Sequence, residues 1–142
     1  MADHNKTVLI IDDSPIIVAR VRAMLEGMPL AATVMQAGSY AEAFPLLESQ
    51  RPGIVLLDIN IPGRNGLEVL SELRLVRGTS LPPVLILTAY DSVTAAMEAA
   101  RRGAVGFLSK PITPDALRDA VHNAIIQSQS AAEGDQGENY LG

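Results

Sequence analysis

Five short apolar runs, each followed by a helix-like stretch, are the feature that most restricts how this chain can fold. Such alternation is typical of βαβ units, in which helices cover a mostly parallel sheet. The first, third and fourth runs are continuous Val, Ile and Leu, so we expect the sheet to be buried on both faces. The predicted strands are residues 7–11, 32–36, 54–57, 84–87 and 105–108.

Residues that favour helix starts and stops stand between these runs. The predicted starts are Ser14 before Pro15, Ser39 with Glu42 as a capping box, Asn65 with Glu68, Asp91, and Thr113 before Pro114. The predicted stops are Gly27, the stretch 51–53, Gly78, Gly103 after Arg101 and Arg102, and about Gln127. Right-handed crossovers between the strands then predict an α/β fold with a doubly wound five-stranded parallel sheet.

The length of 142 residues fits one domain and nearly excludes a two-domain enzyme. Hydrophobic residues make up 48% and charged residues 19%, which is too apolar for a disordered chain. No apolar run approaches the roughly 18 to 20 residues that cross a bilayer, and the N-terminus lacks the apolar stretch of a secretory signal. We therefore expect a cytoplasmic protein with no membrane partner.

Scarce residue types exclude several kinds of site. The chain has no cysteine, and His4 and His122 are its only histidines, so disulfides, thiolate nucleophiles and zinc centres are excluded and any metal would be bound by oxygen. A net charge of −5 with 4% aromatic residues argues against direct nucleic-acid binding. Residues 131–142 are small, polar and acidic, and we interpret them as a disordered tail or linker after a domain at residues 1–130.

Acidic residues follow two of the predicted strands, at the sheet edge where open parallel α/β folds bind ligands. Asp12 and Asp13 follow the first strand, and Asp58 follows the third. Three carboxylates at one edge would repel one another and raise at least one pKa unless a cation lay among them. Oxygen ligands from few side chains suit Mg²⁺ better than Ca²⁺, because Mg²⁺ keeps several waters and completes its shell with phosphate oxygens. The cluster therefore indicates a magnesium site that handles a phosphoryl group.

Two other strand ends supply donors for phosphoryl oxygens. Lys110, after the fifth strand, is one of only two lysines in the chain, and its compact charge could neutralise those oxygens. Thr88, after the fourth strand, adds a hydroxyl donor, and a nearby carboxylate can attack phosphorus to form an aspartyl-phosphate. Taken singly, Asp12 and Asp13 would be ordinary helix caps, and Asp58 or Thr88 an ordinary strand-end residue. Their joint occurrence favours the chemical interpretation.

Together these residues resemble the receiver domain of two-component response regulators. The matching elements are Asp12-Asp13, Asp58 within the stretch 58–66, Thr88-Ala89 and Lys110-Pro111, and the resemblance covers about residues 6–127. It implies a flavodoxin-like (βα)5 topology with strand order 2-1-3-4-5. It also implies a phosphorylation-activated signalling switch, which promotes its own phosphorylation and dephosphorylation but is not an enzyme in the usual sense.

The resemblance assigns a role to each matched residue. Asp58 looks like the phosphoacceptor, which would receive its phosphoryl group from a histidine kinase or a histidine phosphotransfer protein. The residues that resemble Mg²⁺ ligands are Asp13, Asp58 and the Asn60 carbonyl directly, and Asp12 through water. Those that resemble donors to phosphoryl oxygens are Thr88, Lys110 and the backbone amides of Asn60 and Ala89. Lys110-Pro111 resembles the family's cis peptide.

Phe107 matches the family's switch aromatic, whose rotamer follows Thr88. An aromatic in an apolar strand is also common in a plain core, so both interpretations stay open. The family often has tyrosine here, and the stretch 103–107 lacks the acidic pair of winged-helix transcriptional regulators, which argues against their typical receiver dimer. We expect a monomer or a weak phosphorylation-dependent dimer that signals to a downstream protein target through its fourth helix, fifth strand and fifth helix.

Two functions of other classes fit parts of the pattern. An Asp-nucleophile phosphatase of the haloacid-dehalogenase type needs Asp-x-Asp on the first strand and a separate lid, whereas Asp12 and Asp13 are adjacent. A nucleotide- or flavin-binding module needs a Gly-rich phosphate loop after the first strand, which this sequence lacks. Within the receiver family the output stays open: a stand-alone receiver, a phosphorelay intermediate, or a fragment of a hybrid histidine kinase or DNA-binding regulator.

Overall fold

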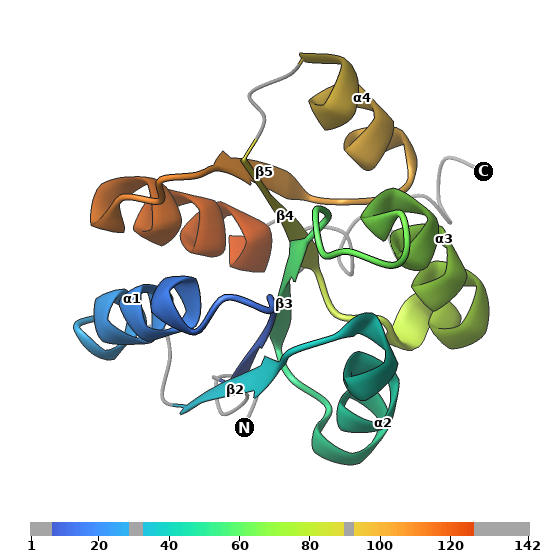
Figure 1. Ribbon diagram of the computed structural model, residues 1–142, viewed down its shortest axis with the longest axis horizontal. Coiled ribbons are helices and arrows are strands. Elements are labelled where there is room, and N and C mark those ends of the chain that lie inside the picture. The colour runs from blue at the N-terminus through green and yellow to red at the C-terminus, as the bar shows by residue number, and fades with distance from the viewer. Residues whose placement is uncertain (1–6, 29–32, 90–92, 127–142) are drawn as a thin grey trace, which may run out of the picture.

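A computed structural model describes residues 7–28, 33–89 and 93–126 and shows a parallel sheet between layers of helices (Figure 1). The strands are β1 (Thr7–Ile11), β2 (Thr33–Ala37), β3 (Ile54–Asp58), β4 (Val84–Thr88) and β5 (Gly106–Ser109). Their order across the sheet is β2-β1-β3-β4-β5, and every neighbouring pair is parallel. The predicted doubly wound α/β fold and its flavodoxin-like strand order are confirmed.

Helices cover both faces of this sheet. They are α1 (Pro15–Glu26), α2 (Tyr40–Gln50), α3 (Gly66–Arg77), α4 (Val93–Arg101) and the helix over residues 114–126, with the short 3-10 helix η2 (Gly78–Ser80) after α3. α1 and the 114–126 helix lie on one face, and α2 and α3 lie on the other (Figure 1). None of the helices in the described ranges is long and apolar enough to cross a membrane.

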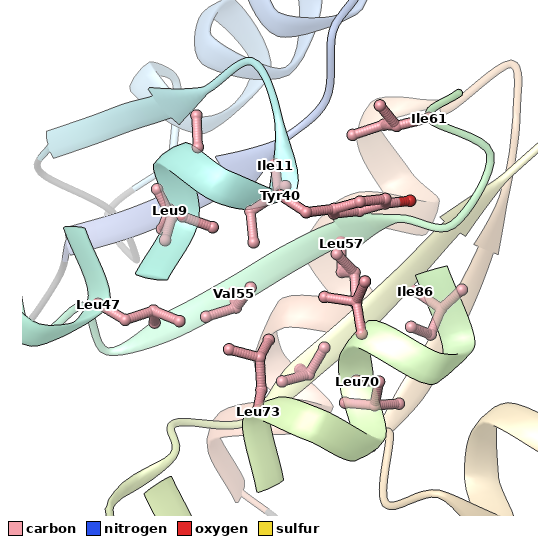
Figure 2. Close-up of a cluster of buried hydrophobic side chains, with 14 of the residues drawn as sticks. Leu9, Ile11, Tyr40, Leu47, Val55, Leu57, Ile61, Leu70, Leu73 and Ile86 are labelled. Atoms are coloured by element: carbon pink, nitrogen blue, oxygen red, sulfur yellow. The ribbon is translucent and has the colours of Figure 1, made fainter. Parts of the chain in front are cut away.

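The sheet separates two apolar layers, because each strand sends alternate side chains to opposite faces. The layer on the α2 and α3 side, drawn in Figure 2, includes Leu9, Ile11, Val55, Leu57, Ile86, Leu70 and Leu73. The layer on the other side includes Val8, Ile10, Leu56, Leu85, Leu87, Val18, Leu25 and Leu117. Every residue of β3 and β4 is buried, and burying one such Leu or Ile side chain contributes about 2 kcal/mol. The two strands therefore hold their polar last residues in fixed positions.

Side-chain caps fix where several helices begin. The predicted capping residues that the structure confirms are Ser14, Ser39, Asn65 and Thr113. The capping box of α2 differs in one detail, since the Glu42 carboxylate accepts its hydrogen bond from the Gly38 amide (2.8 Å) and not from Ser39. Four predicted features lie outside the described residues: Asp91 as a cap, His4, the helix end at Gln127 and the tail at residues 131–142.

Several predicted boundaries are wrong by one or two residues. β5 lies one residue later than predicted, β2 extends one residue past its predicted end at residue 36, and β3 and β4 are one residue longer. The reason is that the backbone ladder continues through polar residues, so that Asp58 and Thr88 still pair with the neighbouring strand. The fourth helix, predicted to reach Gly103, ends at Arg101, because the chain turns there and Gly103 adopts a φ of 101°.

Candidate functional site

Three carboxylates gather at the carboxyl edge of the sheet. Asp12 and Asp13 directly follow β1, and Asp58 is the last residue of the neighbouring strand β3. Each offers a carboxylate oxygen, and these oxygens all lie within 4.8 Å of one another. Asp12 and Asp58 are 0% and 3% exposed, whereas Asp13 lies on the solvent side. Asp12 also accepts a hydrogen bond from the Ser14 amide (2.9 Å). It therefore has two roles, as a member of the cluster and as a hydrogen-bond acceptor at the start of α1.

Lys110 brings a positive charge into this cluster from the end of β5. Its Nζ lies 3.0 Å from Asp12 Oδ2 and 3.1 Å from Asp58 Oδ2. The predicted cis peptide between Lys110 and Pro111 is present in the loop that carries it. Burial lowers the pKa of Lys110, but the hydrogen bonds and charges of the two aspartates outweigh burial and raise the pKa overall. The ammonium group therefore stays charged at physiological pH.

The environment of Asp58 favours a further positive charge. Burial raises the pKa of its carboxyl group above the ordinary 3.8, and the charge of Asp12 adds to this, while hydrogen bonds from the Asn60 amide and Lys110 act in the opposite direction. The Asn60 N–H donates to Asp58 Oδ1 over 2.8 Å. The cluster offers only carboxylate oxygens, and one of its members is open to water. This donor set fits a hard divalent cation such as Mg²⁺, which keeps several of its waters.

The Asn60 side chain joins the ends of β3 and β4. Its Oδ1 accepts hydrogen bonds from the Thr88 hydroxyl (2.9 Å) and from the Ala89 amide (3.1 Å). The resemblance assigns these two donors to phosphoryl oxygens, and here both converge on one uncharged oxygen of the chain itself. The sequence suggested a role only for the Asn60 backbone, so this side-chain contact is a new finding. It shows that the two donors are close enough to share one acceptor.

Tyr40 belongs to the site although no sequence motif identifies it. It is the first residue of α2 and is 4% exposed, and its hydroxyl donates a 2.7 Å hydrogen bond to the main-chain oxygen of Asp58. Figure 2 shows its ring in the apolar layer, with the oxygen directed toward the segment that carries Ile61. Burial raises the pKa of Tyr40 to about 12, and the negative charges of the aspartates add to this. The hydroxyl therefore keeps its proton and remains a donor.

Phe107 lies on the same face of the sheet as Thr88. It pairs in register with Ile86, and Ile86 and Thr88 point to the same face because they are two residues apart on β4. The Phe107 ring is half-buried and packs against the layer formed with α2 and α3. This position is compatible with both a core role and a switch role, and the switch role stays a prediction. The remaining described histidine, His122, is exposed on the 114–126 helix.

Arg102 links α4 to α3, a contact that the sequence did not suggest. Its Nε donates a hydrogen bond of 2.8 Å to Glu98 Oε2, four residues earlier in the chain, and the two side chains form an ion pair. Its Nη1 donates to the Leu67 main-chain oxygen (3.1 Å) and to the Ser71 hydroxyl (3.0 Å), both on α3. The Arg102 guanidinium at the end of α4 therefore also connects α4 to α3 by hydrogen bonds.

The fold and the site together define a class of protein. The chain belongs to the response regulator receiver domain family, whose sequence model matches residues 8–122. This range includes the whole sheet edge from Asp12 to Lys110. Receiver domains of this family act in two-component signalling, and the resemblance drawn from the strand-end residues is confirmed.

Several curated response regulators are similar to this chain. It is 33% identical over 118 residues to the nitrate/nitrite response regulator NarL of Escherichia coli, an alignment that covers 83% of this chain and 54% of NarL. It is 34% identical over 119 residues to PilH of Pseudomonas aeruginosa, covering 84% of this chain and 96% of PilH. The regulatory protein LuxO of Vibrio vulnificus is 32% identical over 137 residues, which are 93% of this chain and 29% of LuxO. The chain thus spans about half the length of NarL and less of LuxO.

Solved structures show the same arrangement of strands and helices. The receiver domain of a LuxO repressor protein from Vibrio parahaemolyticus superposes with a TM-score of 0.80 at 24% identity, covering 90% of this chain and 95% of that one. A response regulator receiver domain from Clostridium thermocellum superposes with a TM-score of 0.76 at 27% identity, covering 88% of this chain and 98% of that one. The fold seen here is therefore the fold of experimentally determined receiver domains.

Proposed function

We propose that this receiver domain is a phosphorylation-activated switch and that Asp58 is its phosphoacceptor. The observation that carries the proposal is the pair of contacts on the Asp58 carboxylate. Asp58 Oδ2 accepts a hydrogen bond from Lys110 Nζ at 3.1 Å and forms an ion pair with it, while Oδ1 accepts a hydrogen bond from the Asn60 amide at 2.8 Å. The Asp58 carboxylate is thereby held in one orientation within the acidic cluster. Membership of the family supports a histidine kinase or a histidine phosphotransfer protein as the phosphoryl donor.

The transfer makes a bond from an Asp58 carboxylate oxygen to phosphorus while the bond from phosphorus to the donor histidine nitrogen breaks. The transferred group brings negative charge to a site that already holds three carboxylates, so the chain must supply positive charge and hydrogen-bond donors. Lys110 supplies the charge next to the reacting carboxylate. The Thr88 hydroxyl and the Ala89 amide supply donors when Asn60 Oδ1 releases them.

Asp12, Asp13 and Asp58 would hold Mg²⁺, with the Asn60 carbonyl as a further oxygen ligand. When bound, the ion would neutralise charge on the aspartates and on the incoming phosphoryl group. The exposure of Asp13 leaves the solvent side of the cluster open, which suits an ion that keeps water ligands. The proposed ligands come from two neighbouring strand ends, so the backbone ladder between β1 and β3 fixes their spacing.

Phosphorylation of this chain should require a divalent cation. We expect intact mass spectrometry to show one added phosphoryl group after incubation with a small-molecule phosphodonor and Mg²⁺, and none in excess chelator, because three carboxylates repel a phosphodianion. Asp13→Ala should lose most of the labelling. Asp119→Ala changes an exposed acid on the 114–126 helix and should be labelled like the wild type. Undiminished labelling of the wild type in chelator would refute the metal role.

Thr88 and Phe107 would convert phosphorylation into a change at the surface. A phosphoryl oxygen is a stronger acceptor than the Asn60 carboxamide, so it would draw the Thr88 hydroxyl toward Asp58. Phe107 lies on the same face and could occupy the space that Thr88 leaves. Phe107 has no hydroxyl, so apolar packing alone would hold its inward position. The face formed by α4, β5 and the 114–126 helix would then present the signal to a downstream protein target.

Thr88→Ala should permit phosphorylation but uncouple this surface from it. The variant keeps Asp58 and Lys110, and loses the Thr88 methyl together with the hydroxyl that would follow the phosphoryl group. We expect amide chemical shifts from Arg101 to Ala120 to respond to a phosphoryl mimic in the wild type and to respond much less in the variant. Thr94→Ala, at an exposed position of α4, serves as the control and should respond fully. A full response in Thr88→Ala would show that the coupling runs elsewhere.

A further inference from the structure

The segment that carries the phosphoacceptor is held from its apolar side by a residue of α2. The buried Tyr40 hydroxyl donates to the Asp58 main-chain oxygen over 2.7 Å, across 18 positions of sequence. A restraint on the backbone of Asp58 also restricts where its carboxylate points, because the side chain projects from that backbone. The hydroxyl therefore acts on the reacting group without touching it.

The same hydroxyl also interacts with the peptide group between Asn60 and Ile61. The Ile61 amide lies against the Tyr40 oxygen and lowers the pKa of the hydroxyl, in opposition to the larger effect of burial. In a planar trans peptide the N–H of one residue and the C=O of the residue before it point in opposite directions. The Asn60 carbonyl belongs to this same peptide group, so an Ile61 amide held near the Tyr40 oxygen also restricts the direction of that carbonyl. This carbonyl is the one that we assign to Mg²⁺.

Gly66, the first residue of α3, closes the packing around this hydroxyl. A Cβ added at Gly66 would lie 2.7 Å from the Tyr40 hydroxyl oxygen and 2.4 Å from the Ile59 Cα. Both distances are shorter than van der Waals contact, so only glycine fits here without displacing the segment after β3. The hydroxyl is therefore enclosed between that segment and the start of α3, and it cannot exchange its partners without moving one of them.

We propose that Tyr40 is a positioning residue of the phosphorylation site, whose hydroxyl fixes the backbone of residues 58–61 and so orients both the Asp58 carboxylate and the Asn60 carbonyl. The inference rests on the proposed function, because it assigns Tyr40 to the metal and phosphoryl chemistry proposed for these groups. Residues that orient metal ligands from outside the coordination shell typically change metal affinity about 10- to 100-fold when mutated. Tyr40 acts through the backbone alone, so the expected loss is at the lower end, about tenfold.

Tyr40→Phe tests this role because it removes the hydroxyl and keeps the ring in the apolar layer. The Mg²⁺ dissociation constant of the full chain is measured by calorimetric titration without phosphodonor, and should rise about tenfold in the variant. The matched control is Ser39→Ala, which removes the N-cap of the same helix and leaves the Tyr40 hydroxyl in place. Its Mg²⁺ affinity should equal that of the wild type. In metal-free Tyr40→Phe, amide chemical shifts should change at residues 58–61 and stay constant over 44–50.

The outcomes of this experiment distinguish a failure of the positioning role of Tyr40 from a failure of the proposed metal site. Equal Mg²⁺ affinity in Tyr40→Phe and wild type would overturn the positioning role and leave the proposed function standing. An equal loss in Tyr40→Phe and Ser39→Ala would also overturn it, since a weakened α2 would then explain the effect. A wild-type chain that binds no Mg²⁺ would overturn the proposed metal site together with the role of Tyr40 in it.

Discussion

Replacing Lys110 with methionine should destabilise the folded chain by about 3 kcal/mol at neutral pH in buffer without Mg²⁺. The Lys110 ammonium lies 3.0 Å from Asp12 and 3.1 Å from Asp58, and both carboxylates are almost fully buried. Methionine replaces the apolar stem of the lysine, so the main loss is the charge, and two buried carboxylates then face each other without a cation. Urea unfolding followed by circular dichroism measures the difference.

The pH dependence of this loss identifies its cause. Burial raises the pKa of Asp58 above 3.8, so the deficit of Lys110→Met should shrink as the pH falls through that raised pKa and the carboxyl group becomes neutral. The raised pKa of Lys110 preserves the wild-type contribution until the pH rises above the ordinary 10.5 of lysine. Lys110→Arg keeps the charge and should retain most of the stability. A deficit that stays constant from acid to neutral pH would contradict the electrostatic explanation.

Asp58→Asn should make the metal-free protein more stable at neutral pH and remove most of the stabilisation by Mg²⁺. Because the pKa of Asp58 is raised in the folded state, the stability that its protonated form contributes is complete below 3.8 and is lost as the pH rises through the raised pKa. Asparagine avoids this loss, and its oxygen can still accept the Asn60 N–H. Mg²⁺ at about 100 times its dissociation constant should stabilise the wild type by about 2.7 kcal/mol.

Thermal unfolding with and without Mg²⁺ measures both effects. The wild type should gain several degrees with Mg²⁺, and Asp58→Asn should gain little because one of the three carboxylate ligands is gone. Asp119→Asn removes an exposed acid far from the cluster along the chain and should gain as much as the wild type. An equal gain in Asp58→Asn and wild type would place the bound ion elsewhere.

The strands and the two apolar layers are predictable because their cause is local. A continuous run such as 54–57 is apolar on both faces, and only a strand covered by helices on both sides accommodates it. The last residue of a strand is less predictable, since its backbone can continue the ladder whatever its side chain. Asp58 and Thr88 are polar, and the sequence therefore suggested that the strands end one residue earlier than they do.

The candidate site was predictable where it depends on strand ends and not where it depends on packing between distant segments. Asp12, Asp58 and Lys110 meet because parallel strands end at one edge. The Asn60 side chain reaches Thr88 across 28 positions, and Tyr40 reaches Asp58 across 18. Such contacts depend on how a helix or loop is set against the sheet, and periodicity carries no information about that.

Intact mass spectrometry of the wild type and Asp58→Asn, after incubation with a small-molecule phosphodonor and Mg²⁺, tests the central claim most directly. Asp58 is the carboxylate that is held at once by the Asn60 amide and by Lys110. The wild type should gain one phosphoryl group, and Asp58→Asn should gain none. Addition of a phosphoryl group to Asp58→Asn, or its absence from the wild type, would contradict Asp58 as the phosphoacceptor.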